Sequence, residues 1–430
     1  MEPVTVGLIG TALMVLLAMI GVRIAYAAAL VGTVGLVILT GDVASGLTAA
    51  GTVPYAKSVN YTLSVLPMFV LIGYLAYHAG MTTTSFEAAK RWLGWLPGGM
   101  AVATIVAVAA FSAVSGASTA AAAVFARVAI PEMLKVGYHR RLAAGVVAAG
   151  STLDSLIPPS ALLVIYAIIV EQSVGKLLLA GFVPGIISAI VYSAIVVMRC
   201  RMNPELGPPI RGYSWRQRFE SLPGTAPIWI VIGLIFTAML FGWATPTEAG
   251  ALGAFSTLLF AWRNRMTGQE FKSALLDTAR LTVMIFTIVW GVLIFVRFLG
   301  FARLPDAISA WVSGLDVSPL VVLLLIYLIY FVLGMFMDAI GMMLLTLPIV
   351  YPIVTDLGYD PIWFGIIVVK LCGIGLLTPP VGLCAFVVNG VRPDIPVGEV
   401  FRGIVPFVVA DLVTLAILTA WPELVTFIVD

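Results

Sequence analysis

Charged side chains are scarce in this sequence. Lys, Arg, Asp and Glu together make up 10% of the 430 residues, whereas 61% of the residues are hydrophobic. A soluble domain carries much more charge on its surface, so this composition excludes an ordinary soluble protein. The apolar residues form long continuous runs, not the alternating strands of a transmembrane β-barrel. The sequence therefore predicts an all-α polytopic protein that is embedded in a lipid bilayer.

Cysteine and histidine are also rare. The chain has three cysteines and two histidines, and the cysteines are spaced too widely to suggest a disulfide framework or a metal cluster. The net charge of +2 gives no reason to expect a nucleic-acid partner. A phosphate-binding glycine loop with lysine and a nucleophile elbow are both missing. We therefore expect no enzymatic activity and no cofactor, so that any energy must come from an ion gradient or a partner protein.

One pattern occurs twice in the chain. Pro158-Pro159 follows Gly137-Tyr138 by 21 residues, and Pro379-Pro380 follows Gly358-Tyr359 by the same distance. Each double proline lies inside a long apolar segment, where proline removes a backbone donor and breaks a helix. Paired interruptions of this kind indicate the binding site of a transporter that is built from two repeats.

The repeated pattern divides the chain into two halves. The first half covers residues 1–200 and begins with scaffold helices within 1–80. A polar connector at 201–225, which contains tryptophan and several arginines, is expected to lie along the cytoplasmic interface. The second half covers 226–430.

Each half is expected to contain one hairpin and one broken helix. The predicted hairpins are 98–131 and 318–355, and the predicted broken helices are 142–170 and 361–389. Small or polar residues near the middle of each hairpin favour a re-entrant loop, because non-helical backbone at membrane depth must line a cavity or be buried in protein. Two crossing helices at each place are the alternative.

The basic residues are divided unevenly between the two sides of this topology. One face receives most of them, and the other receives only Lys57, Lys176 and Arg303. The positive-inside rule assigns the richer face to the cytoplasm. The first hairpin would then enter from the cytoplasm and the second from outside, which makes the two repeats inverted. The same distribution would result from two crossing helices, so it does not establish re-entrance.

Four polar clusters fall at predicted membrane depth. They are the hairpin tips at 115–119 and 334–341, and the helix breaks at 150–160 and 373–380. Backbone carbonyls freed by Gly and Pro, together with hydroxyl and carboxylate oxygens, are typical sodium ligands in transporters. Half-helix N-termini would attract an anionic substrate. In the alternative interpretation, the small residues allow close helix packing and the hydroxyls bond to their own helices.

Several ionisable residues also lie within apolar segments, where they are costly and suggest a function. Asp338, on the second hairpin tip, is the predicted cation ligand. Arg297 either reaches the interface or pairs with a substrate carboxylate, and Arg280 is expected to extend toward the cytoplasmic side. Arg127 and Lys370 are expected to be structural partners of nearby carboxylates or helix ends.

These stretches resemble the large membrane subunit of tripartite ATP-independent periplasmic (TRAP) transporters. The matching segments run from about 112 to 390 and include Ser112-Ala113-Val114-Ser115-Gly116, Ala129-Ile130-Pro131-Glu132, Leu156-Ile157-Pro158-Pro159-Ser160, Ala244-Thr245-Pro246-Thr247-Glu248, Gly334-Met335-Phe336-Met337-Asp338 and Thr378-Pro379-Pro380. The length is similar to that of the separate large subunit rather than of a fusion with the small one. The resemblance implies the architecture of the ion-transporter superfamily, with an elevator mechanism.

The resemblance also implies a function and partners. The function would be sodium-coupled secondary active import of an organic anion, such as a C4-dicarboxylate or a sugar acid, across the bacterial inner membrane. A small four-helix TRAP membrane subunit and a periplasmic substrate-binding protein would be its partners. The alternatives are a sodium/carboxylate symporter that works without a binding protein, and a non-transporting membrane scaffold.

Site residues carry over from the resemblance by position. The first sodium site would comprise Ser115, Gly116, Ser118, Thr119, Thr152 and Ser155. The second sodium site would comprise Gly334, Asp338, Gly375 and Thr378. The substrate would contact Arg297, Ser118, Ser160, Pro159 and Pro380.

Three positions depart from the family pattern. Ala117 replaces a common serine, Cys384 replaces a usual asparagine, and Asp154 stands where the family usually has glycine. The Asp154 carboxylate would strengthen cation binding, couple a proton or pair with a basic residue, and the sequence does not distinguish these roles.

Overall fold

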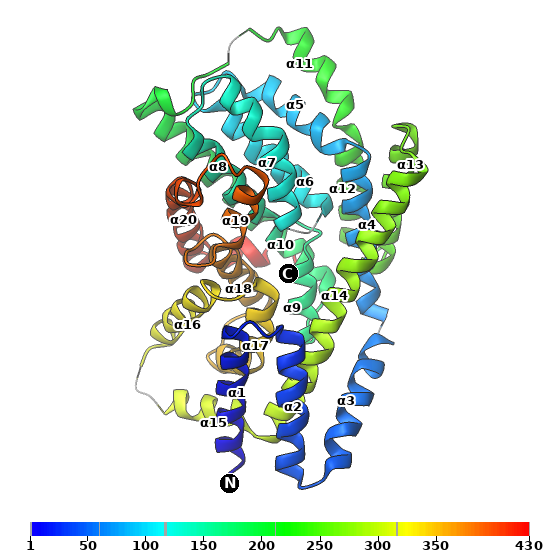
Figure 1. Cartoon of the computed structure of the whole chain (residues 1–430), viewed down its shortest axis with the longest axis vertical. Helices are drawn as coiled ribbons and strands as arrows, with labels where there is room; N and C mark the ends of the chain where they lie inside the picture. The colour runs from blue at the N-terminus through cyan, green and yellow to red at the C-terminus, as the bar shows by residue number, and fades with distance from the viewer. Residues whose placement is uncertain (1, 60, 116–117, 211, 315–316, 430) are drawn as a thin grey trace.

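The computed structural model describes residues 2–59, 61–115, 118–210, 212–314 and 317–429 of the chain. Within these ranges all regular secondary structure is helical (Figure 1). Four described helices are long and apolar enough to cross a membrane, or up to six spans if each of two bent helix pairs counts as one. The four are α10 (Val174–Met202), α14 (Gly268–Phe301), α17 (Ala339–Asp356) and α20 (Val397–Ala420). The prediction of an all-α membrane protein is confirmed.

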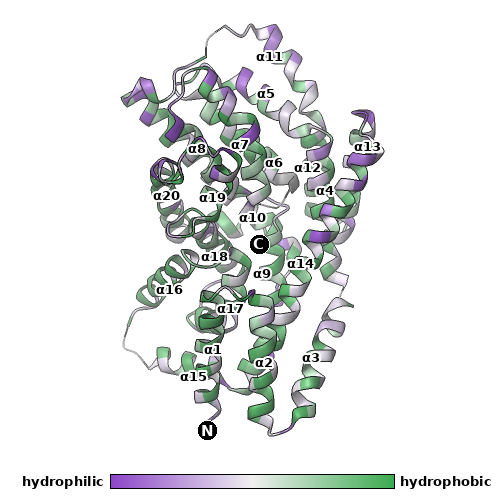
Figure 2. Cartoon of the chain, viewed as in Figure 1, coloured by the Kyte–Doolittle hydropathy of each residue, from purple (hydrophilic) through white to green (hydrophobic). Residues whose placement is uncertain are grey.

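The hydrophobic residues cover most of these helices, whereas hydrophilic residues gather around α11 and the end of α13 (Figure 2). The N-terminal part consists of α1 (Pro3–Met19), α2 (Ile24–Thr40), α3 (Val43–Ser58) and α4 (Val65–His78). Helix α2 packs closely along α14, because a Cβ atom at Gly291 would lie 2.0 Å from the Ala25 carbonyl oxygen. The two backbones can approach this closely only because Gly291 has no side chain.

Two short helices connect these scaffold elements to the predicted hairpins. Helix α5 (Met81–Leu93) follows α4 at a bend of 69° and packs on α6, and α15 (Leu304–Ser313) follows α14 and packs on α17. Lys90 of α5 forms an ion pair with Glu132 of α7, at 3.2 Å. Ser309 of α15 donates a hydrogen bond to Asp356, at 2.5 Å. Each hairpin is thus tied to the short helix that precedes it.

In the first half of the chain, the predicted hairpin consists of two helices, and the predicted broken helix consists of two others. The hairpin helices are α6 (Gly99–Ser115) and α7 (Ser118–Lys135), and the broken helix consists of α8 (Arg140–Gly150) and α9 (Ala161–Ile169). A 3₁₀ turn at Ser151–Ser155 and the cis peptide bond Pro158-Pro159 lie in the break. Helix α10 follows and ends the half.

The second half has the same order of elements. Its hairpin is α16 (Pro319–Gly334) and α17, and its broken helix is α18 (Pro361–Gly375) and α19 (Leu383–Val391), followed by α20. The cis peptide bond Pro379-Pro380 lies in this break. A Cβ atom at Gly403 of α20 would lie 2.0 Å from the Arg141 carbonyl oxygen of α8, so the two halves meet backbone to backbone. Re-entrance, inversion of the repeats and the domain boundaries stay predictions.

The connector between the halves contains more helix than its polar sequence suggests. Helix α10 continues to Met202, and α11 (Trp215–Ser221) precedes α12 (Ala226–Leu240) and α13 (Pro246–Arg263). At the start of α13, the Thr245 hydroxyl accepts a bond from the Glu248 N–H while the Glu248 carboxylate accepts one from the Thr245 N–H. This is a capping box with proline in the first turn. A short helix, α21 (Glu423–Thr426), follows α20.

Candidate functional site

A cavity of about 930 Å³ lies where the hairpin tips, the helix breaks and the helices α2 and α14 meet. Five of the residues predicted to form the site line it: Ser118, Thr119, Ser155, Ser160 and Asp338. Their positions in the sequence span more than half of the chain, and the fold brings them to one space. Leu376 and Leu383, on either side of the second break, line the cavity as well. The cavity therefore touches both tips and both breaks.

Asp154 is the carboxylate of the first break. Its side chain lines the cavity while the residue is only 2% exposed. The hydroxyl of Ser118, the first residue of α7, donates a hydrogen bond to Asp154 Oδ1. Among the described residues no basic side chain forms an ion pair with Asp154, so pairing with a basic residue is not observed. The carboxylate instead joins the first hairpin tip to the first break.

The other hydroxyls of the first break bond to nearby carbonyl oxygens. Thr152 Oγ1 donates to the Ala149 carbonyl at 2.8 Å, and Ser155 Oγ donates to the Thr152 carbonyl at 2.6 Å. Ser160 Oγ donates to the Ser155 carbonyl at 2.5 Å. Each hydroxyl oxygen keeps lone pairs that can accept or coordinate. Ser155 and Ser160 present theirs next to the cavity, whereas Thr152 is not part of the cavity wall.

At the second tip, Asp338 is the N-cap residue of α17. Its Oδ2 accepts a hydrogen bond from the Gly341 N–H at 3.0 Å, and the residue also lines the cavity. Asp338 thus stabilises a helix start whether or not it binds a cation. The tip and the second break touch through their backbones, because the Val381 N–H donates to the Met335 carbonyl at 3.2 Å.

Glycine makes this backbone contact possible. A Cβ atom at Gly375 would lie 2.6 Å from the Gly334 Cα, and one at Gly334 would lie 2.7 Å from the Gly375 Cα. Both glycines were predicted as sodium ligands, but neither lines the cavity. Thr378 likewise lies off the cavity wall, where its hydroxyl donates to the Ile374 carbonyl at 2.5 Å.

The remaining predicted site residues lie elsewhere. Pro159 and Pro380 are in the breaks but not in the cavity wall. Arg297 lines a different cavity of about 320 Å³, together with Glu171. Ser115 ends α6, and Gly116 falls outside the described residues. Their assignment to sodium or substrate stays a prediction.

Two arginines that the sequence did not assign to the site line the cavity. Arg280 of α14 was expected only to extend toward the cytoplasmic side, and Arg23 precedes α2 as its N-cap residue. Arg280 lies 3.5 Å from Asp277 Oδ1, and its side chain is largely exposed. The sequence signal that could have placed Arg280 in the site is that it is a basic residue within an apolar helix. The cavity wall therefore contains two guanidinium groups and two carboxyl groups, those of Asp154 and Asp338.

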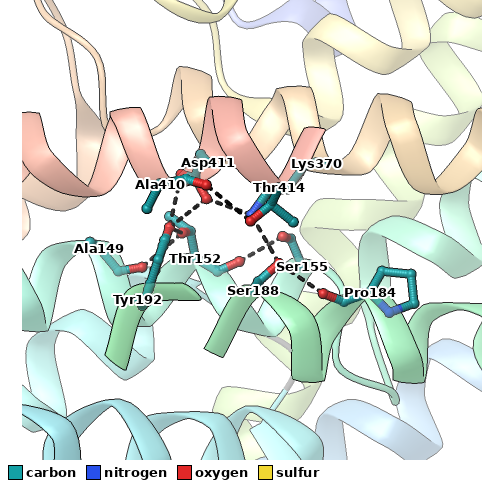
Figure 3. A network of polar contacts seen from close by, with 10 residues as sticks. All are labelled: Ala149, Thr152, Ser155, Pro184, Ser188, Tyr192, Lys370, Ala410, Asp411 and Thr414. Atoms are coloured by element: carbon teal, nitrogen blue, oxygen red, sulfur yellow. Dashed lines mark hydrogen bonds and ion pairs between the residues drawn. The ribbon is translucent and has the colours of Figure 1, made fainter. Parts of the chain in front are cut away.

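A second polar cluster is buried beside the first break (Figure 3), and it meets the cavity wall at Ser155, whose hydroxyl donates to the Thr152 carbonyl. Lys370 of α18 forms an ion pair with Asp411 of α20 at 2.5 Å and donates to Ser188 Oγ at 3.1 Å. The Tyr192 hydroxyl lies 2.8 Å from both Asp411 oxygens, and 3.4 Å from Thr152 Oγ1. The prediction that Lys370 partners a nearby carboxylate is confirmed. Low exposure, 4% for Lys370 and 1% for Asp411, makes this pair costly to break.

Sequence comparison identifies the chain that carries this arrangement. The family model described as "Tripartite ATP-independent periplasmic transporter, DctM component" matches residues 11–424. The chain belongs to the DctM family.

Relatives within the DctM family cover most of the chain. The C4-dicarboxylate TRAP transporter large permease protein DctM of Pseudomonas aeruginosa is 35% identical, over 86% of this chain and 86% of its own length. The sialic acid TRAP transporter large permease protein SiaM of Vibrio cholerae is 33% identical, over 85% of each chain. The isethionate TRAP transporter permease protein DctMQ of Oleidesulfovibrio alaskensis is 30% identical, over 89% of this chain and 61% of its own length.

Two solved structures share the fold of this DctM-family chain. The YdaH transporter of Alcanivorax borkumensis superposes with a TM-score of 0.59 over 84% of this chain and 85% of its own. MtrF of Neisseria gonorrhoeae superposes with a TM-score of 0.59 over 98% and 95%. Both are 14% identical in sequence, so the likeness concerns the fold alone. The chain is a multi-pass membrane protein of a family of transporter permeases.

Proposed function

We propose that this chain is the large permease of a tripartite transporter and that it imports an organic anion by sodium-coupled symport across the bacterial inner membrane. The observation that carries the proposal is the cavity of about 930 Å³, whose wall combines both hairpin tips and both helix breaks in a chain of the DctM family. Such a site, at the junction of two repeats and surrounded by broken helices, is typical of secondary transporters.

The substrate that we propose is a carboxylate such as a C4-dicarboxylate or a sugar acid. The relatives are named for C4-dicarboxylate, sialic acid and isethionate, which are all organic anions. Arg23 and Arg280 supply positive charge at the cavity wall, and the guanidinium group matches a carboxylate with two parallel hydrogen bonds. Ser118 and Ser160 would orient the substrate through their hydroxyls.

Sodium coupling is proposed for the same cavity. Sodium is a hard cation that takes oxygen ligands, and the wall offers the hydroxyls of Ser118, Thr119 and Ser155 on one side and the carboxylate of Asp338 on the other. Asp154 adds a second carboxylate next to the first group. A carboxylate beside a hydroxyl cluster would strengthen cation binding through its charge.

We propose an elevator mechanism, which the position of the cavity supports. On one side it is bounded by the hairpins and broken helices, and on the other by α2 and α14, which pack tightly on each other. We propose that the hairpins and broken helices move together relative to α2 and α14, and that they carry the substrate as they move. A small four-helix membrane subunit would support α2 and α14, and a periplasmic binding protein would deliver the anion.

Uptake into proteoliposomes tests the proposal. The chain is reconstituted with its small subunit and binding protein, and import of a labelled C4-dicarboxylate and a labelled sialic acid is measured with an inward sodium gradient. We expect import to require sodium and to fall at least tenfold in Asp338→Ala, because a charged ligand is lost. Asp306→Ala is the matched control, since Asp306 is exposed on α15 and does not line the cavity.

Three results would count against parts of this proposal. Import that is unchanged without sodium would remove the coupling. Import that persists without the binding protein would favour a stand-alone symporter. Absence of import for a panel of organic acids, with no stabilisation of the protein by sodium, would favour a non-transporting scaffold.

A further inference from the structure

An apolar groove of about 940 Å³ runs along α10 and shares no lining residue with the candidate site. Its wall on α10 follows one helical face from Phe182 to Met202, and α6 and α12 supply the other sides. A length of about 20 residues corresponds to roughly 30 Å of helix, which is comparable with the thickness of a bilayer's hydrocarbon core. The groove is several times larger than the ~150 Å³ cavities that bind benzene.

One end of the groove carries a single charge. Arg201, in the last turn of α10, is the only charged residue in the wall as described, and it lies beside Met198, Met202 and Trp229. Its guanidinium group is exposed and forms no ion pair or side-chain hydrogen bond with any described residue. The charge distribution of the sequence assigns this end to the cytoplasmic face, where anionic lipid headgroups attract basic side chains. Trp229 is typical of the same interfacial layer.

The other end of the groove is apolar and reaches the first helix break. The ring centroids of Phe182 on α10 and Phe236 on α12 lie 4.6 Å apart. Ile157, next to Pro158, lines the groove from the break. Between the two ends the wall consists mainly of small and aliphatic side chains such as Val106, Ala110 and Ala194. A hydrocarbon chain is therefore suited to the groove, and water is not.

We propose that this groove binds a phospholipid, with the phosphodiester at Arg201 and an acyl chain along α10 toward Ile157. Guanidinium groups bind phosphate oxygens through two parallel hydrogen bonds, which explains one arginine at the mouth of an otherwise apolar groove. The chain would fill the space between α12 and the helices α6 and α10. This inference does not depend on the transported substrate.

Photolabelling tests this assignment. The full chain is placed in nanodiscs of phosphatidylethanolamine that contain phosphatidylglycerol with a diazirine on its acyl chain, and the labelled residues are mapped by mass spectrometry. We expect labels on α6 and α10 at the groove, and competition by unlabelled phosphatidylglycerol but not by diacylglycerol, which lacks the phosphate. Arg201→Gln should reduce labelling about fivefold, the effect expected for one basic residue near an anionic surface.

Two further variants keep the test decisive. Arg263→Gln is the matched control, because Arg263 lies in the last turn of α13, has no ion pair with any described residue and does not line the groove. It should leave the labelling unchanged. Ala194→Trp should fill the groove and abolish labelling, while thermal unfolding shows that the protein remains folded. Equal labelling of wild type, Arg201→Gln and Ala194→Trp would overturn the proposal. Loss of labelling when the small subunit is added would overturn it too, and would assign the groove to that subunit.

Discussion

The two helix breaks differ in how each one meets its hairpin tip. In the first half a side chain makes the contact, since the Ser118 hydroxyl bonds to the buried Asp154 carboxylate. In the second half the backbones touch at Gly334 and Gly375, and a main-chain bond joins Met335 to Val381. A side-chain contact can be changed by a ligand that competes for the carboxylate, whereas a backbone contact leaves no room for one. We therefore expect that a bound ligand can change the contact between tip and break in the first half, whereas the backbone contact in the second half stays fixed.

The largest effect is expected from the ion pair that holds the second broken helix. Lys370→Met leaves Asp411 buried without its cation, and removal of one partner of a buried pair costs about 3–5 kcal/mol. Thermal unfolding in detergent should show a large fall in Tm. The double variant Lys370→Met/Asp411→Leu should recover much of the loss, because no buried charge remains. A double variant as unstable as the single one would show that the pair itself, rather than an orphaned charge, supplies the stability.

The next effect concerns the side-chain contact of the first half. Ser118→Ala leaves Asp154 without its described donor, and an unsatisfied buried charged group costs about 2–3 kcal/mol. Adding Asp154→Gly removes that unsatisfied group, so the double variant should be more stable than Ser118→Ala alone. Chemical denaturation of the four proteins in a double-mutant cycle measures the coupling. Simple additivity of the two substitutions would contradict the proposed contact.

A smaller loss should follow from a methyl group between the two backbones of the second half. In Gly375→Ala the new Cβ would lie 2.6 Å from the Gly334 Cα, so the tip and the break must separate. Overpacking of this kind costs about 1–3 kcal/mol. Gly390→Ala on α19 is the control, since no atom lies within 4 Å of a Cβ there. In thermal unfolding we expect a lower Tm for Gly375→Ala than for Gly390→Ala. Equal Tm values would contradict a tight backbone contact between the second tip and the second break.

The sequence predicted the elements that long apolar runs and repeated prolines define. Helices α5 and α15 were not predicted, because α5 (Met81–Leu93) is polar in composition and α15 (Leu304–Ser313) is short. Five predicted site residues line the cavity because glycine and proline mark the tips and breaks in the sequence, whereas the sequence does not show which residues of a tip or break face the cavity. Arg23 and Arg280 were not assigned to it because their place depends on how α2 packs along α14, a contact set by Gly291 and Ala25 rather than by any motif.

The smallest effect on stability, and the sharpest separation of two roles, is expected at Asp338. As N-cap of α17 it stabilises the helix, and Asp338→Ala should cost about 1 kcal/mol. Asparagine caps a helix about as well as aspartate, so the free energy of unfolding of Asp338→Asn should lie within a few tenths of a kcal/mol of the wild-type value. The same variant lacks the negative charge, so the rise in Tm that sodium produces in the wild type should shrink markedly. Thermal unfolding with and without sodium, with choline as the matched cation, measures both effects. If Asp338→Asn keeps the full sodium-dependent shift, Asp338 is a cap only, and cation binding would then rest on the first half, at Asp154 and the hydroxyls around it.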